Sequence, residues 1–167
     1  MASNHQSLLA YVKNSASDRL DLAKTINAWV WASVQPSVPG AVPESIEDVA
    51  EMLRGACGWR TNLVRDLFGS IGVNSRYVNF YDVPLQGGHT TLEVFIDGEW
   101  RWFDPTFGLY FTFKGSDEPI SIQEARSNWP DVVAKQSDLA GWQGKFSDFD
   151  DVEVSTYSTH EETFLNM

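Results

Sequence analysis

The stretch HTTLEVFIDGEWRWFDPT, residues 89–106, decides the fold. From residue 76 onward the hydrophobic period is two, and Asp97-Gly98 interrupts it within this stretch. A period of two is typical of strands, and Asp-Gly between two such runs is a strong signal for a two-residue hairpin turn. The sequence therefore predicts two antiparallel strands, 89–96 and 99–104, joined by a tight turn.

The turn fixes which side chains share a face of this hairpin. His89 shares the face of Asp104 as its diagonal neighbour, at roughly 7 Å between the backbones. A carboxylate there can hold the tautomer of an imidazole and stabilise the imidazolium. The alternative is that both residues only mark the turn boundaries of the two strands. With Ile96 opposite Glu99, the pairs on this face are Phe95 with Trp100, Glu93 with Trp102, and Thr91 with Asp104.

Cysteine and histidine are scarce, which narrows the search for a catalytic site. Cys57 is the one cysteine, so an intrachain disulfide and a multi-cysteine zinc or iron-sulfur site are excluded. His5 and His160 lie near the polar ends of the chain, where disorder is commonest. His89 is the interior histidine. The question is therefore whether Cys57 and His89 meet.

Cys57 has two opposed interpretations. An unpaired cysteine is often a small buried hydrophobic residue. Its neighbours favour a nucleophile, because the sequence Gly55-Ala56-Cys57-Gly58 allows close approach of a substrate backbone. Apolar residues recur with helical spacing from Cys57 to Ile71, which predicts a helix whose N-terminal dipole faces the sulfur. A nearby imidazolium would lower the thiol pKa further and could protonate a leaving amine.

The rest of the chain predicts more helices before the hairpin and more strands around it. Helices first and strands afterwards favour an α+β domain. The helices are predicted from apolar residues at helical spacing and from capping residues, and the strands are predicted from apolar residues at every second position. The expected elements are helices at 17–35 with Ser17 as cap, at 45–53 opened by Ser45 and Asp48, and from Ser121 and Glu124 to Trp129-Pro130, and strands at 76–81 and 110–113.

Length, charge and hydropathy limit the class of protein. The 167 residues suit a single domain over 1–167. A formal charge of −11 opposes contact with nucleic acid or anionic lipid. We expect a cytoplasmic protein, because no apolar stretch is long enough to span a membrane and the start lacks the features of a secretion signal. Residues 146–167 contain acidic residues and no Lys or Arg, which predicts a solvated acidic segment.

Several motifs follow one another in a specific order. Gly55-Ala56-Cys57 opens a helix, Gly72 to Val78 follows it, His89 begins a strand, and Asp97-Gly98-Glu99-Trp100 leads to Phe103-Asp104-Pro105-Thr106. This order, over about residues 45–107, resembles the transglutaminase-like superfamily, which is related in fold to papain-like cysteine proteases. The resemblance implies a papain-like core within 45–113, with N-terminal helices packed on an antiparallel β-sheet. It also implies Cys57 as nucleophile, His89 as general base and acid, and Asp104 as the orienting carboxylate.

Two departures from relatives in that superfamily bear on the activity. Crosslinking transglutaminases of the animal type carry Trp directly after the cysteine, whereas Gly58 precedes Trp59 here. Peptide N-glycanases bring cysteine pairs for zinc, which this chain lacks. The expected activity is a cysteine-dependent hydrolase or acyltransferase that acts on a peptide or amide bond through a thioester, with hydrolysis favoured. The alternative is a catalytically silent module that binds a protein partner.

The sequence also suggests roles for side chains outside the three catalytic candidates. Trp59 and Trp102 are best placed to wall a cleft for a peptide or protein substrate near Cys57. Glu93 could bind a substrate amine, although a partly exposed strand pair with Trp102 is favoured. Arg76 is expected to anchor the strand after the catalytic helix. We expect no metal and no cofactor. The Cys57 N–H is one candidate oxyanion donor, and the second stays open.

Overall fold

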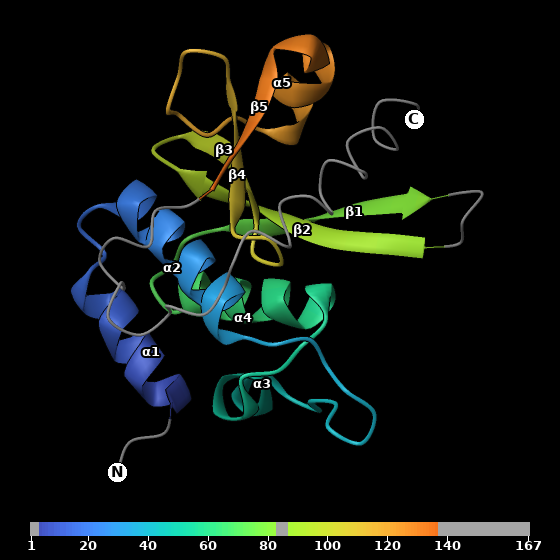
Figure 1. The fold of residues 1–167 in the computed structure, drawn as a ribbon. Coiled ribbons are helices and arrows are strands. Elements are labelled where there is room, and N and C mark those ends of the chain that lie inside the picture. Colours follow the sequence, from blue (N-terminus) through green and yellow to red (C-terminus); the bar gives the residue numbers. More distant parts are fainter. Residues whose placement is uncertain (1–3, 83–86, 137–167) are drawn as a thin grey trace.

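A computed structural model describes residues 4–82 and 87–136 of the chain (Figure 1). Its elements are α1 (Asn4–Asn14), α2 (Arg19–Ser33), α3 (Ile46–Met52), α4 (Cys57–Gly69), β1 (Ser75–Asp82), β2 (Gly87–Ile96), β3 (Glu99–Asp104), β4 (Leu109–Phe113), α5 (Ile122–Ser127), a 3₁₀ turn (Trp129–Asp131) and β5 (Val132–Gln136). The strands form one antiparallel sheet in the order β1-β2-β3-β4-β5. Figure 1 shows α1 to α4 gathered together and α5 apart from them, beside β5. The predicted α+β class, with N-terminal helices packed on an antiparallel sheet, is confirmed.

The helix starts follow the capping signals of the sequence, with one shift. The capping boxes predicted for α3 and α5 are both present. α2 is capped by Asp18 and not by Ser17, because the Asp18 carboxylate accepts a hydrogen bond from the backbone N–H of Asp21 at 2.9 Å. A carboxylate at this position also interacts favourably with the helix dipole. The prediction of Ser17 as the cap was therefore wrong by one residue.

The hairpin of β2 and β3 has the predicted register. Ile96 lies opposite Glu99, and Leu92 lies opposite Phe103. Asp97 and Gly98 form the turn with positive φ angles of 52° and 87°, which the favoured two-residue hairpin turn requires. Because side chains alternate along a strand, this register also decides which residues of β2 and β3 face the helices.

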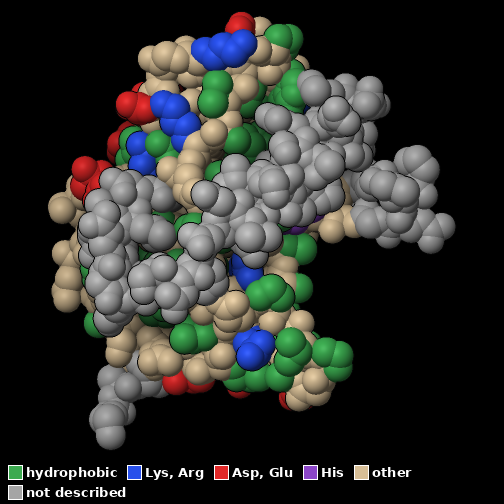
Figure 2. Space-filling view, in the orientation of Figure 1, with side chains coloured by type: hydrophobic (Ala, Val, Ile, Leu, Met, Phe, Trp, Pro, Cys, Tyr) green, Lys and Arg blue, Asp and Glu red, His purple; other side chains and the backbone are tan. Residues whose placement is uncertain are grey.

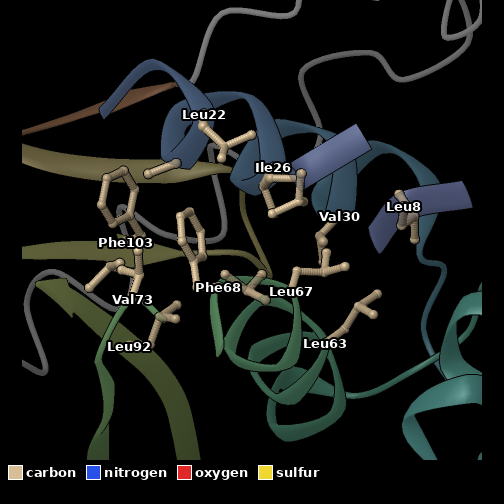
Figure 3. Close-up of a cluster of buried hydrophobic side chains, with 14 of the residues drawn as sticks. Leu8, Leu22, Ile26, Val30, Leu63, Leu67, Phe68, Val73, Leu92 and Phe103 are labelled. Carbon is tan, nitrogen blue, oxygen red and sulfur yellow. The ribbon is translucent and has the colours of Figure 1, made fainter. Parts of the chain in front are cut away.

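Buried side chains fill both faces of the sheet. The larger cluster joins the sheet to α1, α2, α3 and α4, as Figure 3 shows for side chains of α2, α4 and β2. A second cluster on the other face contains Trp102, Phe111 and Ala125 of α5. This packing fixes α4 against β2, and Cys57 is the first residue of that helix. The labelled members of the larger cluster are Leu8, Leu22, Ile26, Val30, Leu63, Leu67, Phe68, Val73, Leu92 and Phe103.

Two elements, α1 and β5, have no clear signal in the sequence. α1 buries His5, Leu8 and Val12, and two apolar side chains are too few for a distinct helical pattern. His5 does not lie in a disordered end as expected: it is buried, and its Nε2 lies 2.7 Å from Oδ2 of Asp66 on α4. β5 is only partly buried, and its pairing with β4 defines it.

The C-terminal part of the chain leaves three expectations open. His160 and the acidic segment 146–167 lie outside the described residues. A single domain over 1–167 therefore stays a prediction.

We expect Gly108→Ala to destabilise the fold strongly. Gly108 has a φ of 67°, and an added Cβ would lie 2.9 Å from Cγ of Trp31 on α2. Backbone strain of about 1 kcal/mol and overpacking of about 1–3 kcal/mol should together lower the free energy of unfolding by about 2–4 kcal/mol. Gly98→Ala is the matched control, because Gly98 has a φ of 87° but no atom within 4 Å of the added Cβ. Urea denaturation measures both, and equal losses would refute a role for the Trp31 contact.

Candidate active site

Cys57 lies at the N-terminus of α4. Ala56 precedes the helix in an extended conformation, and its carbonyl accepts the N–H of Arg60 at 3.0 Å. The Cys57 side chain is partly exposed. The first N–H groups of a helix have no hydrogen-bond partner within the helix, and they carry partial positive charge. A thiolate at this position is therefore favoured by the helix that carries it.

Asp104 ends β3 and is completely buried. One carboxylate oxygen, Oδ1, accepts the backbone N–H groups of Thr106 at 2.8 Å and Phe107 at 3.3 Å. The other oxygen, Oδ2, lies 2.5 Å from Nε2 of His89. The turn after β3 thus holds the carboxylate rigidly, so that one oxygen is aimed at the imidazole.

His89 lies between Asp104 and Cys57. Its Nε2 meets Asp104, and its ring also forms a hydrogen bond with the Cys57 side chain. Because Nε2 is bonded to Asp104, we assign the hydrogen bond with the Cys57 thiol to Nδ1, the other ring nitrogen. The ring of Phe107 lies against the imidazole, with the ring centroids 5.5 Å apart. The structure therefore brings together all three residues that the sequence singled out.

The electrostatics of the site favour a charged pair. The hydrogen bond with His89 lowers the pKa of Cys57 below its usual value, whereas burial of the thiol acts to raise it. Hydrogen bonds from the backbone N–H groups of Thr90 and Gly58, and the charge of His89, lower this pKa further. Burial acts to lower the pKa of His89, but the charge and hydrogen bond of Asp104, together with Cys57, raise it to about 10. Both shifts favour the charged form of the pair, a thiolate on Cys57 and an imidazolium on His89.

The labelling rate of Cys57 should show this pair directly. At pH 6 iodoacetamide is expected to alkylate Cys57 far faster than free cysteine, whose pKa of about 8.5 leaves little thiolate. Since the pKa of His89 is raised, its stabilising contribution is full below pH 6.5 and is lost as the pH rises through about 10. Any activity that needs the imidazolium should decline in that same alkaline range. A labelling rate that rises only above pH 8 would refute the ion pair.

The two tryptophans expected at a substrate cleft have different positions. Trp102 has an exposed fraction of 0%; it stacks on Phe111 with centroids 3.6 Å apart, and its Nε1 donates to Oγ1 of Thr91 at 2.9 Å. A side chain without accessible surface cannot line a cleft, so the prediction for Trp102 was wrong. Trp59 is partly buried and packs against the larger cluster, two residues after Cys57. A substrate contact of Trp59 stays a prediction.

Glu93 is fully buried, so the expectation of a partly exposed pair with Trp102 was wrong. Its Oε2 lies 2.6 Å from Nε of Arg76, and its Oε1 accepts the backbone N–H of Ile122 at 2.8 Å. The guanidinium of Arg76 also lies over the Trp100 ring, 4.1 Å from its centroid. Glu93 thus joins β1 and α5 to β2 and offers no surface to an amine, and Arg76 anchors β1 as expected.

Three residues at the site were not identified from the sequence. Arg60 is buried and donates to the carbonyls of Gly55 and Thr106, and Thr61 Oγ1 donates to the carbonyl of Thr90 at 3.1 Å. Arg60 and Thr61 lie three and four residues after Cys57, so helical spacing places them on the same side of α4 as Cys57. This spacing is the sequence signal from which they could have been identified. The third, Phe107, has no such signal, because its contact with the imidazole depends on the tertiary fold.

The described residues contain no group of three or more His, Cys, Asp and Glu side chains that could hold a metal ion. Figure 2 shows acidic side chains scattered around the edge of the molecule in that view.

Within the described residues, 4–82 and 87–136, every helix is too short or too polar to cross a bilayer.

Comparison with known proteins identifies the family of the chain and a similar fold. The family model of the transglutaminase-like superfamily matches residues 6–105, more than half of the chain. A crystal structure of a "putative cysteine protease" from Cytophaga hutchinsonii is similar, with a TM-score of 0.50, 18% sequence identity, 85% of this chain covered and 47% of the other. The chain thus spans about half the length of that protein, and the likeness concerns the fold. No curated protein matched the chain. Its fold, the order of its motifs and the family match together show that the chain belongs to the transglutaminase-like superfamily.

Proposed function

We propose that the protein is a cysteine hydrolase that cleaves an amide bond of a peptide or protein through a thioester on Cys57. One observation carries this proposal. The imidazole of His89 is hydrogen-bonded on one side to a fully buried Asp104 and on the other to Cys57 at the start of α4. Nucleophile, base and orienting carboxylate in this relation are the parts that acyl transfer requires.

The residues have distinct roles in the proposed reaction. The Cys57 thiolate attacks the carbonyl carbon, and the carbonyl π electrons move to the oxygen to give a tetrahedral oxyanion. When the C–N bond breaks, the imidazolium of His89 gives its Nδ1 proton to the leaving nitrogen, and the acyl group remains as a thioester. Neutral His89 then takes a proton from water, which attacks the thioester and releases the acid and the Cys57 thiolate. Asp104 holds the ring and stabilises its charged form in each cycle.

Two features bear on the fate of the acyl group. The N–H of Cys57, at the first position of α4, is the proposed donor to the oxyanion. Glu93, the carboxylate considered for binding an amine, is buried with Arg76. Water is therefore the proposed acceptor, and hydrolysis is favoured over transfer.

Turnover of a synthetic peptide library in ¹⁸O-labelled water tests the proposed hydrolysis. We expect new C-terminal carboxylates that carry one ¹⁸O atom from the solvent. The same digest with an added primary amine measures transfer, which would appear as an amide of that amine. Transfer without ¹⁸O incorporation would replace the hydrolase by an acyltransferase. If peptides, amides and esters are all left intact, the protein is a binding module.

A further inference from the structure

Arg60 connects the two halves of the candidate site. It lies on α4, one turn after Cys57, and only 4% of its surface is exposed. Its Nε donates to the carbonyl of Gly55 at 3.2 Å, and its Nη1 donates to the carbonyl of Thr106 at 2.7 Å. Gly55 stands two residues before the nucleophile, and Thr106 stands two residues after Asp104. One side chain therefore joins the backbone on both sides of the triad.

Each of these carbonyls belongs to a segment that fixes the position of a proposed catalytic side chain. Gly55 is buried, and its N–H donates to the carbonyl of Gln35 at 2.9 Å, which fixes the approach to α4. The N–H of Thr106 donates to Oδ1 of Asp104, so the turn that holds the carboxylate is also the turn that Arg60 holds. Figure 1 shows this β3–β4 connection reaching down toward α4.

A guanidinium suits this position better than other side chains do. A buried charge is costly unless its donors are bonded, and here carbonyls from two segments accept them. The planar fork of arginine fixes the directions of several donors at once, whereas lysine is a point charge on a flexible stem. Replacing Arg60 would therefore loosen the distance between the two segments even where the fold survives.

We propose that Arg60 is a positioning residue, which holds the Asp104 turn against the start of α4 and so maintains the hydrogen bond between His89 and Cys57. This inference rests on the proposed function. A displacement of about 1 Å between catalytic groups can lower a rate by about 10²-fold. The Cys57 thiolate depends on His89, so the same displacement should also change the pH dependence of the thiol.

The test compares Arg60→Lys and Arg60→Met with the wild type and with Arg65→Met as the control. Arg65 lies on the same helix, but it contacts Ser75 and the ring of Tyr77 instead of the site. The measurement is the pH dependence of Cys57 alkylation by iodoacetamide, with a thermal melt of each variant. At pH 6 we expect the rate to fall by about tenfold or more in Arg60→Met and by less in Arg60→Lys. Arg65→Met should keep the wild-type profile.

The outcomes separate this inference from the proposed function. A wild type that is labelled only above pH 8 would refute the catalytic pair itself. A wild type labelled at pH 6, together with folded Arg60 variants that keep its pH profile, would refute the positioning role alone. If both Arg60 variants are unfolded at the temperature of the assay, Arg60 serves the fold as a whole and the inference is also overturned. Once a substrate is known, kcat should fall in the folded variants while KM stays nearly unchanged.

Discussion

Cys57→Ala is expected to abolish turnover while leaving the thermal melt close to that of the wild type. The proposed reaction has no other nucleophile, and loss of such a residue lowers kcat by roughly 10⁴-fold or more. Cys57 is only partly buried, so truncation of its side chain removes little packing. We expect a change in the free energy of unfolding within about 0.5 kcal/mol, or a small gain. Product formation and a thermal melt on the same preparation check both parts.

Loss of stability in Cys57→Ala, together with no turnover by the wild type, would indicate a binding module instead of an enzyme. A structural cysteine in the core costs about 1 kcal/mol or more when it is truncated, because a small cavity is left. If Cys57→Ala melts well below the wild type, and the wild type turns over no amide, ester or glutamine substrate, the protein is a silent binding module. Normal capture of a protein partner by the variant would support that conclusion.

Asp104→Asn is expected to keep the fold and to lower kcat by roughly 10³–10⁴-fold. The amide oxygen of Asn can still accept the N–H groups of Thr106 and Phe107, so the turn is retained. Its NH₂ group then faces Nε2 of His89 and favours the tautomer with the proton on Nδ1. That tautomer cannot accept a proton from the Cys57 thiol, and the imidazolium loses its counter-charge.

Asp97→Asn is the matched control for this substitution. Asp97 lies on the exposed hairpin turn with a positive φ, a conformation that Asn tolerates well. We expect wild-type kcat and a wild-type melt in the control. The reading of Asp104 as an orienting carboxylate is contradicted if Asp104→Asn retains more than about a tenth of wild-type kcat, or if it unfolds while Asp97→Asn does not.

The local signals in the sequence were sufficient for much of the fold. Asp97-Gly98 fixed the register of β2 and β3, and that register places His89 and Asp104 where they meet. Capping boxes marked the starts of α3 and α5. These features depend on interactions between residues close in sequence, so they can be predicted without knowledge of the tertiary structure.

Burial of the second face of the sheet could not be predicted in this way. Alternation along β2 and β3 shows that Glu93 and Trp102 share a face, but it does not show whether anything covers that face. α5 and its neighbours cover it, because Ala125 packs in the same cluster as Trp102. Glu93 is tied to the backbone of Ile122 at the start of α5. This contact spans 29 residues and has no local signal.

The contacts that assemble the site are of the same long-range kind. Arg60 meets Thr106 across 46 residues, and Phe107 meets His89 only because the turn after β3 returns toward β2. Sequence patterns identified the three residues that the proposed chemistry needs. They did not identify the side chains that hold those three at working distances, because these roles exist only in the folded chain.

Mass spectrometry of the acyl-enzyme tests the central claim most directly. The wild type is mixed with the peptide library, and the reaction is quenched with acid within seconds. The protein is then digested, and the mass of the fragment that contains Cys57 is measured. The account predicts a mass increase on this fragment equal to the acyl part of a cleaved peptide, sensitive to hydroxylamine as a thioester is, and absent from Cys57→Ala. Cleavage of the peptides without any adduct on Cys57, or with an adduct on another residue, would contradict it.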